Sequence, residues 1–164
     1  MRIEPLSSQH RDALAVFVGG ISDGDRVFVD RTLISQVKVA SWTQAVPERR
    51  LVALEDDDSV SGILTVSRGI GWSAHTADVR LVVHSERRGR GVGAALATAG
   101  LELARSMGLS KLSVETIAAN SGGQATFVAL GFEVEAVLRG QVTDDAGNLH
   151  DMVILSHWLD DSSV

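Results

Sequence analysis

The chain has 164 residues, 45% of them hydrophobic, which predicts a folded domain with room for a core. Its formal net charge of −6 argues against a broad nucleic-acid-binding surface, so we expect no nucleic-acid partner. Because the chain has no cysteine and no two of its five histidines lie four residues apart, disulfides, cysteine nucleophiles and thiolate metal sites are excluded, and we expect no metal.

The N-terminal region predicts a strand and two helices. Its first residues form no apolar signal segment, and no apolar run reaches the length of a membrane span, so we expect a cytoplasmic protein with no membrane partner. The strand covers Arg2–Leu6, and Ser7 is placed to cap a helix that runs to about Val18. Apolar residues at helical spacing predict a second helix from Val27 to Ala40.

The middle of the chain predicts three strands and a long helix. Arg50–Glu55 and Val60–Ser67 flank three consecutive aspartates, which is typical of an antiparallel hairpin with a solvated turn. A further strand covers Ala77–His84. Apolar residues at helical spacing then predict a helix over Gly91–Met107, which Gly108 ends.

The remaining chain predicts three strands and one short helix. In chain order these are a strand over Lys111–Thr116, a helix from Ser121 or Gly122 to Gly131, and strands over Phe132–Arg139 and Met152–Trp158. The order β-α-α-β-β-β-α-β-α-β-β indicates an α+β fold with a mixed sheet rather than a doubly wound one. We expect one domain over residues 1–159 and a frayed acidic tail over residues 160–164.

The glycine-rich turn Arg88-Gly-Arg-Gly91-Val-Gly93 joins a predicted strand to the long helix. Glycines let the backbone approach a phosphate closely, and the first N–H groups of a helix have no intrahelical partner. The helix dipole adds partial positive charge there, so the turn predicts an anion site. The alternative is a turn that only ends the strand tightly. The spacing matches neither the dinucleotide fingerprint nor the P-loop.

Arg88, Gly91 and Gly93 fit an R-x-x-G-x-G pattern, which resembles the acyl-CoA pyrophosphate loop of the GNAT family of N-acetyltransferases. A second segment, from Asn120 to Gly131-Phe132, is similar to the family's segment after its fifth strand and stands at the right distance from the first. Together the two segments cover about residues 76–139. The resemblance implies the GNAT fold, a mixed, mostly antiparallel central sheet with splayed fourth and fifth strands, flanked by helices.

The resemblance also implies acetyl-CoA, or another acyl-CoA, as cosubstrate. The pantetheine arm would bond the backbone of Leu81, Val82 and Val83, whose side chains are expected in the core. The pyrophosphate would lie on the backbone N–H groups of Gly89, Arg90, Gly91, Val92, Gly93 and Ala94. Arg88 holds the motif's basic position, and Arg90 is expected either to reach an outer phosphate or to be solvated.

Two further positions match cofactor contacts in the family. Asn120 is expected to bond the pantetheine, to cap the following helix, or to do both. Phe127 stands where many members carry the tyrosine that serves as general acid, and it is expected to pack against the pantetheine sulfur. The chain contains no tyrosine at all. The acid would then be Ser121, Thr126 or a water, unless the thiolate leaves unprotonated.

Acetyl transfer to an amine also needs a base, because only the neutral amine attacks. Glu115 is the first candidate, since glutamates at the matching place act as base in some protein N-terminal acetyltransferases of the family. The alternative for Glu115 is a structural ion pair or strand-edge position. His84 and Asp78 are further candidates, and His84 titrates in a useful range but borders the loop, which favours a structural position.

The resemblance therefore implies a bacterial-type N-acetyltransferase that moves an acetyl group from acetyl-CoA to a primary amine of a small molecule, peptide or protein. The alternative is a GNAT fold that binds acyl-CoA as a sensor or scaffold with little or no turnover, which the missing tyrosine favours. The sequence leaves the acceptor open. A homodimer agrees with the habit of the family, although no sequence feature demands it.

Overall fold

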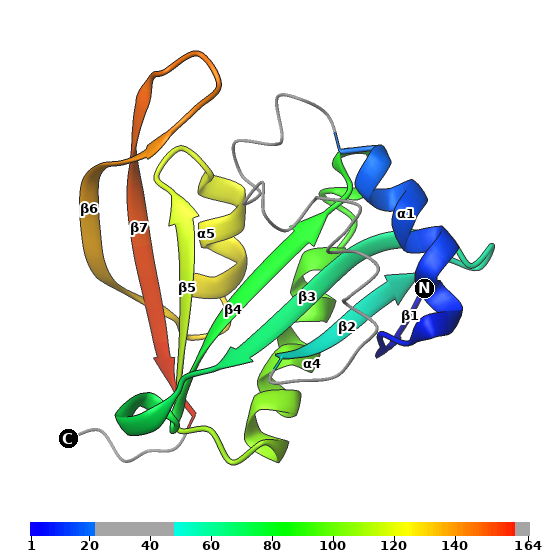
Figure 1. The fold of residues 1–164 in the computed structure, drawn as a ribbon, viewed down its shortest axis with the longest axis horizontal. Helices are drawn as coiled ribbons and strands as arrows, with labels where there is room; N and C mark the ends of the chain where they lie inside the picture. The colour runs from blue at the N-terminus through cyan, green and yellow to red at the C-terminus, as the bar shows by residue number, and fades with distance from the viewer. Residues whose placement is uncertain (22–47, 160–164) are drawn as a thin grey trace.

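The computed structural model describes residues 1–21 and 48–159, so the helix expected from Val27 to Ala40 lies outside the described residues. The described chain forms one seven-stranded sheet with the order β1-β2-β3-β4-β5-β7-β6 (Figure 1). The strands are β1 (Arg2–Pro5), β2 (Glu48–Leu54), β3 (Val60–Arg68), β4 (Thr76–Val83), β5 (Lys111–Ile117), β6 (Glu133–Thr143) and β7 (Leu149–Trp158). Neighbouring strands are antiparallel, except that β4 and β5 are parallel. This mixed, mostly antiparallel sheet confirms the predicted fold class.

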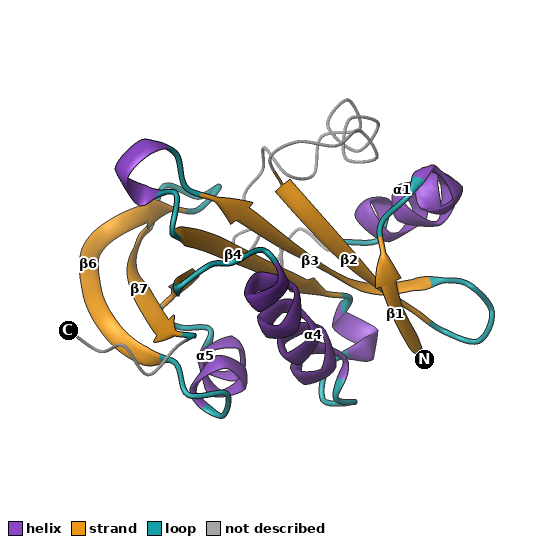
Figure 2. Cartoon of the chain, turned by 90° about the horizontal axis from the view of Figure 1, so that it is seen from below, coloured by secondary structure: helices purple, strands orange, loops and turns teal. Residues whose placement is uncertain are grey.

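Helices cover both faces of the sheet (Figure 2). The helices are α1 (Arg11–Gly19), α4 (Val92–Ser106) and α5 (Ser121–Val128), and the short 3-10 turns are η1 (Ser8–His10), η2 (Gly71–Ser73) and η3 (Ser85–Arg87). α1 lies on one face, and α4 and α5 lie on the other. None of the described helices is long and apolar enough to cross a membrane.

Strand alternation divides the apolar side chains between two cores. On the α1 face, Val52 and Ile63 pack in one cluster with Leu14 of α1. On the α4 face, Leu64 and Leu96 belong to a larger cluster that continues to β5 and β7. The two cores hold the middle of the sheet fixed, which gives β4 a rigid setting at the centre of the molecule.

The helix α5 is shorter than predicted: it ends at Val128 instead of Gly131. The chain leaves the helix through a turn in which the N–H of Phe132 donates to the carbonyl of Phe127 at 3.1 Å. Gly131 adopts a φ of 87° in this turn, and such a left-handed residue is typical of a helix end.

The last two strands are longer than predicted. β6 continues to Thr143 instead of ending at Arg139, and β7 begins at Leu149 instead of Met152. The two strands pair with each other in these extensions, where Thr143 stands opposite Leu149. The residues of these extensions are in strands because they pair with each other, and such pairing is only weakly indicated by the local sequence. The sequence pattern therefore missed them.

Candidate active site

A wedge opens in the middle of the sheet between β4 and β5. The two parallel strands pair at Thr76–Lys111, Ala77–Leu112 and Asp78–Ser113, and they diverge beyond the last of these pairs (Figure 1). The other edge of β4 stays paired with β3 as far as Val83. The β5-facing edge of β4 therefore presents backbone N–H and C=O groups that β5 does not bond, and an extended ligand with amide groups fits such an edge.

The side chains of the predicted pantetheine-binding residues are partly buried and turned away from this edge. Leu81 and Val83 pack against the core on the α4 face, whereas Val82 packs against the core on the α1 face. The expectation that these three side chains belong to the core is confirmed. Only the backbone of this stretch of β4 can face the wedge.

The chain leaves β4 through η3 and the glycine-rich turn and enters α4 at Val92. Gly89 and Gly91 have φ of 69° and 82°, a left-handed conformation that other residues adopt only with strain. A Cβ on either glycine would meet no described atom within 4 Å, so the space beside them is open. The glycines thus serve the backbone conformation and not a tight packing contact.

The N-terminus of α4 carries no side-chain cap in the described chain, because its N-cap residue is Gly91. The N–H groups of the first turn therefore remain available, and the helix dipole adds partial positive charge at the same place. Arg88 and Arg90 are exposed on the same turn. The arrangement fits a phosphate group, as the sequence predicted, and it stands at the open end of the wedge.

Asn120 caps α5 and connects it to β5. Its Oδ1 accepts from the backbone N–H of Gly123 at 3.1 Å, and its Nδ2 donates to Oγ1 of Thr116 at 3.2 Å. The predicted role as a helix cap is therefore confirmed. Thr126 donates its hydroxyl to the carbonyl of Gly122 at 3.0 Å within the same helix, so this proton already has an acceptor.

Phe127 is 4% exposed and belongs to the core on the α4 face. Its ring packs edge-on against the ring of Phe132, with 5.1 Å between the two centroids. The residue that replaces the family's tyrosine is therefore mainly a packing residue in the structure. Its contact with a cofactor stays a prediction.

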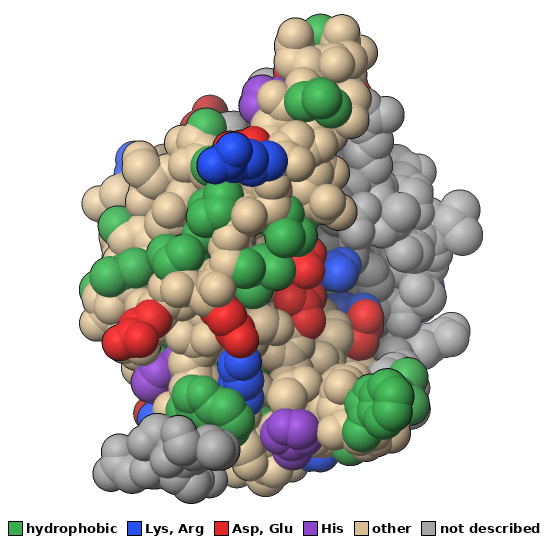
Figure 3. All heavy atoms as spheres, turned by 90° about the vertical axis from the view of Figure 1, so that its left-hand side faces the viewer, with side chains coloured by type: hydrophobic (Ala, Val, Ile, Leu, Met, Phe, Trp, Pro, Cys, Tyr) green, Lys and Arg blue, Asp and Glu red, His purple; other side chains and the backbone are tan. Residues whose placement is uncertain are grey.

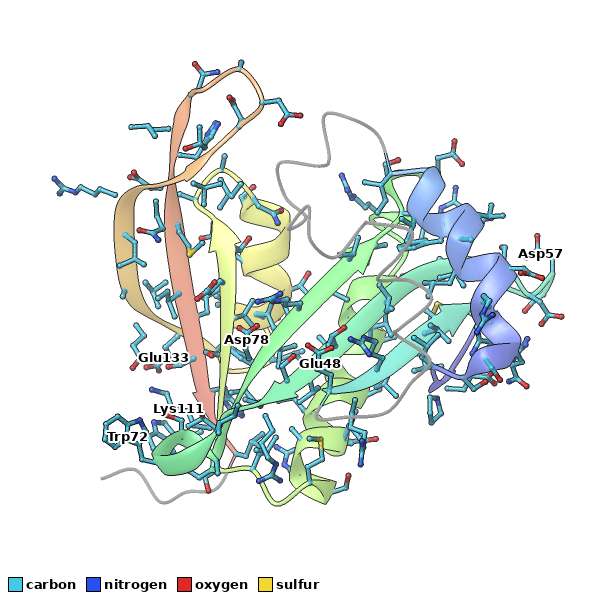
Figure 4. The ribbon with its side chains drawn as sticks, in the orientation of Figure 1. Glu48, Asp57, Trp72, Asp78, Lys111 and Glu133 are labelled. Carbon is cyan, nitrogen blue, oxygen red and sulfur yellow. The ribbon has the colours of Figure 1, made fainter. Side chains whose placement is uncertain are left out.

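A polar row crosses the opposite face of the sheet at the closed end of the wedge. Residues opposite one another on six successive strands form this row, which consists of Glu48, Ser67, Asp78, Ser113, Ser156 and Glu133. Figure 4 labels Glu48, Asp78 and Glu133, which lie along one line across the strands. The row shares its face with α1, and Asp78 occupies the point where β4 and β5 separate.

Asp78 combines partial burial with a central position in this row. Burial raises the pKa of Asp78 above its ordinary value, because the charged form loses solvation. Arg80 opposes part of this rise, since its Nε donates to Oδ2 of Asp78 at 2.9 Å. A half-buried carboxyl with a raised pKa at the point of a wedge is a suitable proton acceptor.

The other two predicted base candidates, Glu115 and His84, lie apart from this point. Glu115 is exposed on β5, two residues beyond Ser113, so it shares a face with Asp78. His84 follows the far end of β4, where its ring lies 6.1 Å from that of Phe17 on α1. A Cβ on Gly20 would lie 2.9 Å from Nε2 of His84, so this histidine fills the space beside α1.

The sequence pattern ranked Asp78 below Glu115, and the structure shows why. Glu115 came first because it matches a position of the family's base, whereas Asp78 was only a further candidate on the preceding strand. Only the register of β4 against β5 places Asp78 at the last paired position, and only the packing around it raises its pKa. Among residues 1–21 and 48–159, no group of three or more His, Asp or Glu side chains could hold a metal ion.

A sheet that opens between two parallel strands onto an uncapped helix N-terminus is the framework of an acetyltransferase, and comparison with known families agrees. The model of the Acetyltransferase (GNAT) family matches residues 25–132. The chain therefore belongs to the GNAT family, as its two motifs predicted. No curated protein sequence matches the chain.

Solved structures share the fold at low sequence identity. Ribosomal-protein-alanine N-acetyltransferase from Brucella melitensis superposes with a TM-score of 0.85 at 21% identity, over 96% of this chain and 99% of that one. The structure of yncA from Salmonella typhimurium, described as an acetyltransferase with its cofactor acetyl-CoA, gives 0.83 at 20% identity over 100% and 96%. Ribosomal-protein-S5-alanine acetyltransferase from Vibrio fischeri gives 0.82 at 14% identity over 99% and 94%.

Proposed function

We propose that the protein is an N-acetyltransferase that moves the acetyl group of acetyl-CoA to a primary amine of a small molecule, peptide or protein. The observation that carries the proposal is the continuity of the wedge with the turn. The free edge of β4 leads directly into the uncapped N-terminus of α4. In CoA, the extended pantetheine arm with its amide groups leads in the same way to a pyrophosphate. A family neighbour solved with acetyl-CoA supports this donor.

The donor would be held mainly by backbone groups. The edge of β4 at Leu81–Val83 bonds the amides of pantetheine, and the N–H groups from Gly89 to Ala94 bond the pyrophosphate. Arg88 and Arg90 add positive charge to the turn. One continuous sheet from β1 to β7 supports our proposal that residues 1–159 act as a single domain.

The reaction forms a carbon–nitrogen bond and breaks the carbon–sulfur bond of the thioester. The attacking amine must lose a proton, and we assign this proton to a carboxylate on the face that carries α1. Asp78 is better suited than Glu115, because burial raises its pKa and it stands at the point of the wedge. Glu115 stays the second candidate, and the packing of His84 against α1 supports a structural part for that residue.

The departing thiolate lacks the usual donor, since Phe127 has no hydroxyl. Thr126 is bonded within its own helix, which leaves Ser121, exposed at the start of α5, or a water as the donor. The moderate pKa of a thiol also allows the thiolate to leave unprotonated. The replacement of the tyrosine favours a second function, a binding protein that holds acyl-CoA with little turnover.

The test measures binding and turnover separately. Calorimetry with acetyl-CoA measures binding, and release of free CoA with a panel of amines measures turnover. We expect acetyl-CoA to bind and to be consumed with at least one amine, and Asp78→Asn to lower kcat/KM by about 10²-fold or more at neutral pH. Glu115→Gln tests the second candidate in the same way, and it should lower kcat/KM less than Asp78→Asn does; a larger loss in Glu115→Gln would make Glu115 the base. Binding without turnover supports the binding protein, and an absence of binding overturns both functions.

A further inference from the structure

A basic side chain stands beside Asp78 on the same face of β4. Arg80 follows Asp78 by two residues, so both side chains point to the face that carries α1. Nε of Arg80 donates to Oδ2 of Asp78 at 2.9 Å, and the side chains of Arg80 and Asp78 are 43% and 27% exposed. The pair therefore presents a positive and a negative charge side by side, and both charges are partly accessible.

Arg80 lies where β4 and β5 have already separated. The parallel register ends at Asp78 and Ser113. Continued by two residues on each strand, this register brings Arg80 level with Glu115 across the wedge, and both side chains point to the α1 face. On that face the mouth of the wedge is therefore bordered by a positive side chain on β4 and a negative one on β5, with Asp78 at the point of the wedge.

Charges of both signs continue from this mouth across the neighbouring strands. Arg80 stands opposite Thr65 of β3, and Thr65 stands opposite Arg50 of β2. Arg50 forms an ion pair with Glu48. Figure 3 shows the molecule from the side of β6, and acidic and basic side chains lie next to each other on the described surface in this view. Mixed charge of this kind favours a ligand that carries both signs over a ligand that carries only one.

An amine with a carboxylate on the adjacent carbon matches the three charges at the mouth. Its nitrogen fits between Asp78 and Glu115, which attract the ammonium form and leave Asp78 to accept the proton. Its carboxylate fits on Arg80, because a planar guanidinium bonds the two oxygens of a carboxylate through parallel N–H groups. A diamine would bring its second positive charge towards the same guanidinium and be repelled.

We propose that the acceptor is a free α-amino acid and that Arg80 selects it by binding its carboxylate. The inference rests on the acetyl transfer proposed above. The amino nitrogen forms the bond to the acetyl carbon, its proton passes to Asp78, and CoA leaves with the electron pair of the carbon–sulfur bond. Arg80 takes no part in these steps and determines specificity. An amino acid whose carboxyl group is bound in an amide, as at the N-terminus of a peptide, lacks the group that Arg80 recognises.

Matched acceptors test the part of the carboxylate. Each of the common L-amino acids is compared with its amide and with the amine that lacks the carboxyl group, as in the set of leucine, leucinamide and 3-methylbutylamine. The diamine 1,4-diaminobutane is added to the panel, and release of free CoA measures turnover. We expect at least one amino acid to be used with a kcat/KM about tenfold or more above that of its amide, because a site built to bond a group rejects an analogue that lacks it.

Variants of Arg80 test the residue. Arg80→Gln should raise KM for the amino acid about tenfold or more and change KM for its amide little. The loss of the charge beside Asp78 acts on both acceptors and cancels in their ratio. Arg80→Glu should shift the preference towards 1,4-diaminobutane, which a purely structural part of Arg80 would not produce. Arg49→Gln, on the opposite face of β2, is the matched control and should keep the ratio.

Calorimetry of the CoA-bound protein with the same acceptors separates this inference from acetyl transfer. Binding of an amino acid that Arg80→Gln weakens supports the inference even without turnover, a result that contradicts only the enzymatic function. Turnover of amides and simple amines as fast as that of amino acids overturns the inference and leaves acetyl transfer standing. A preference for amino acids that Arg80→Gln leaves unchanged also overturns it, as does an absence of both binding and turnover with every amino acid. Circular dichroism checks that each variant is folded.

Discussion

Asn120 donates through Nδ2 to the hydroxyl oxygen of Thr116 at 3.2 Å, and this bond ties the first turn of α5 to the strand that borders the wedge. The same side chain accepts from the backbone N–H of Gly123, so one residue fixes both the start of the helix and its position on β5. Asn120 therefore sets the geometry of the site even before any ligand contact is considered.

Asn120→Ala should destabilise the protein by about 1 kcal/mol, because the cap of α5 and the bond to Thr116 are both lost. Urea unfolding measures this change. Thr116→Val removes only the second bond, so the double variant should lose less than the sum of the two single changes. Thr98→Val, on the exposed side of α4, controls for the loss of a threonine hydroxyl. Additive losses would show that the bond between Asn120 and Thr116 contributes nothing.

Gly91→Ala should destabilise the protein by about 1–2 kcal/mol, because an alanine at a φ of 82° is strained although the space around it is open. The strain acts on the turn that presents the first N–H groups of α4, so acetyl-CoA should also bind more weakly. Gly122→Ala is the control. It stands in the first turn of α5, its added Cβ likewise meets no described atom within 4 Å, and better helix propensity should leave stability equal or higher. Equal losses in both variants would contradict the strain argument.

The raised pKa of Asp78 makes its effect on stability depend on pH. Since the folded-state pKa lies above the unfolded value, the folded protein binds the proton more tightly, and the charged carboxylate opposes folding at neutral pH. This penalty begins to fall as the pH drops through the folded-state pKa, and it is gone below the unfolded value. Asp78→Asn is uncharged at every pH. The variant should therefore gain the most stability over the unchanged protein at neutral pH. This gain, measured as the difference between the two free energies of unfolding, should shrink as the pH falls.

Asp57 provides a control of opposite sign for that titration. Hydrogen bonds from Ser59 lower the pKa of Asp57, so its charge favours folding above the unfolded pKa, and this contribution is lost as the pH falls. Asp57→Asn should be less stable than the unchanged protein at neutral pH and should approach it in acid. Urea unfolding at a series of pH values measures both variants. Parallel curves for the two would contradict the opposite pKa shifts.

The backbone geometry of the proposed donor side was predictable from sequence because its determinants are local. Gly91 allows a left-handed φ in its own turn, and Asn120 caps the helix that follows it directly. Both effects involve only residues that are close in the sequence. The acceptor side was less predictable, because the position of Asp78 depends on which residue of β5 it faces. The ends of β6 and β7 were missed for the same reason. Thr143 and Leu149 belong to strands because they pair with each other, and the sequence does not show this pairing.

The ring of Phe127 allows a direct test of the missing proton donor. Phe127→Tyr adds a hydroxyl at a position that is 4% exposed, and an unpaired buried hydroxyl costs about 1–3 kcal/mol. We expect the free variant to be less stable than the unchanged protein by this order. If the new hydroxyl faces the wedge, the thioester sulfur becomes its partner, so acetyl-CoA should raise the melting temperature of the variant more than that of the unchanged protein.

Turnover by the same variant tests the chemistry. A phenol placed at the sulfur stabilises the departing thiolate, so Phe127→Tyr should raise kcat with little change in KM for the amine. Phe132→Tyr is the matched control, because it adds a hydroxyl to the neighbouring buried ring, which is 2% exposed. That variant should be destabilised without a gain in kcat or an extra stabilisation by acetyl-CoA. Equal behaviour of the two variants would show that Phe127 serves the core alone.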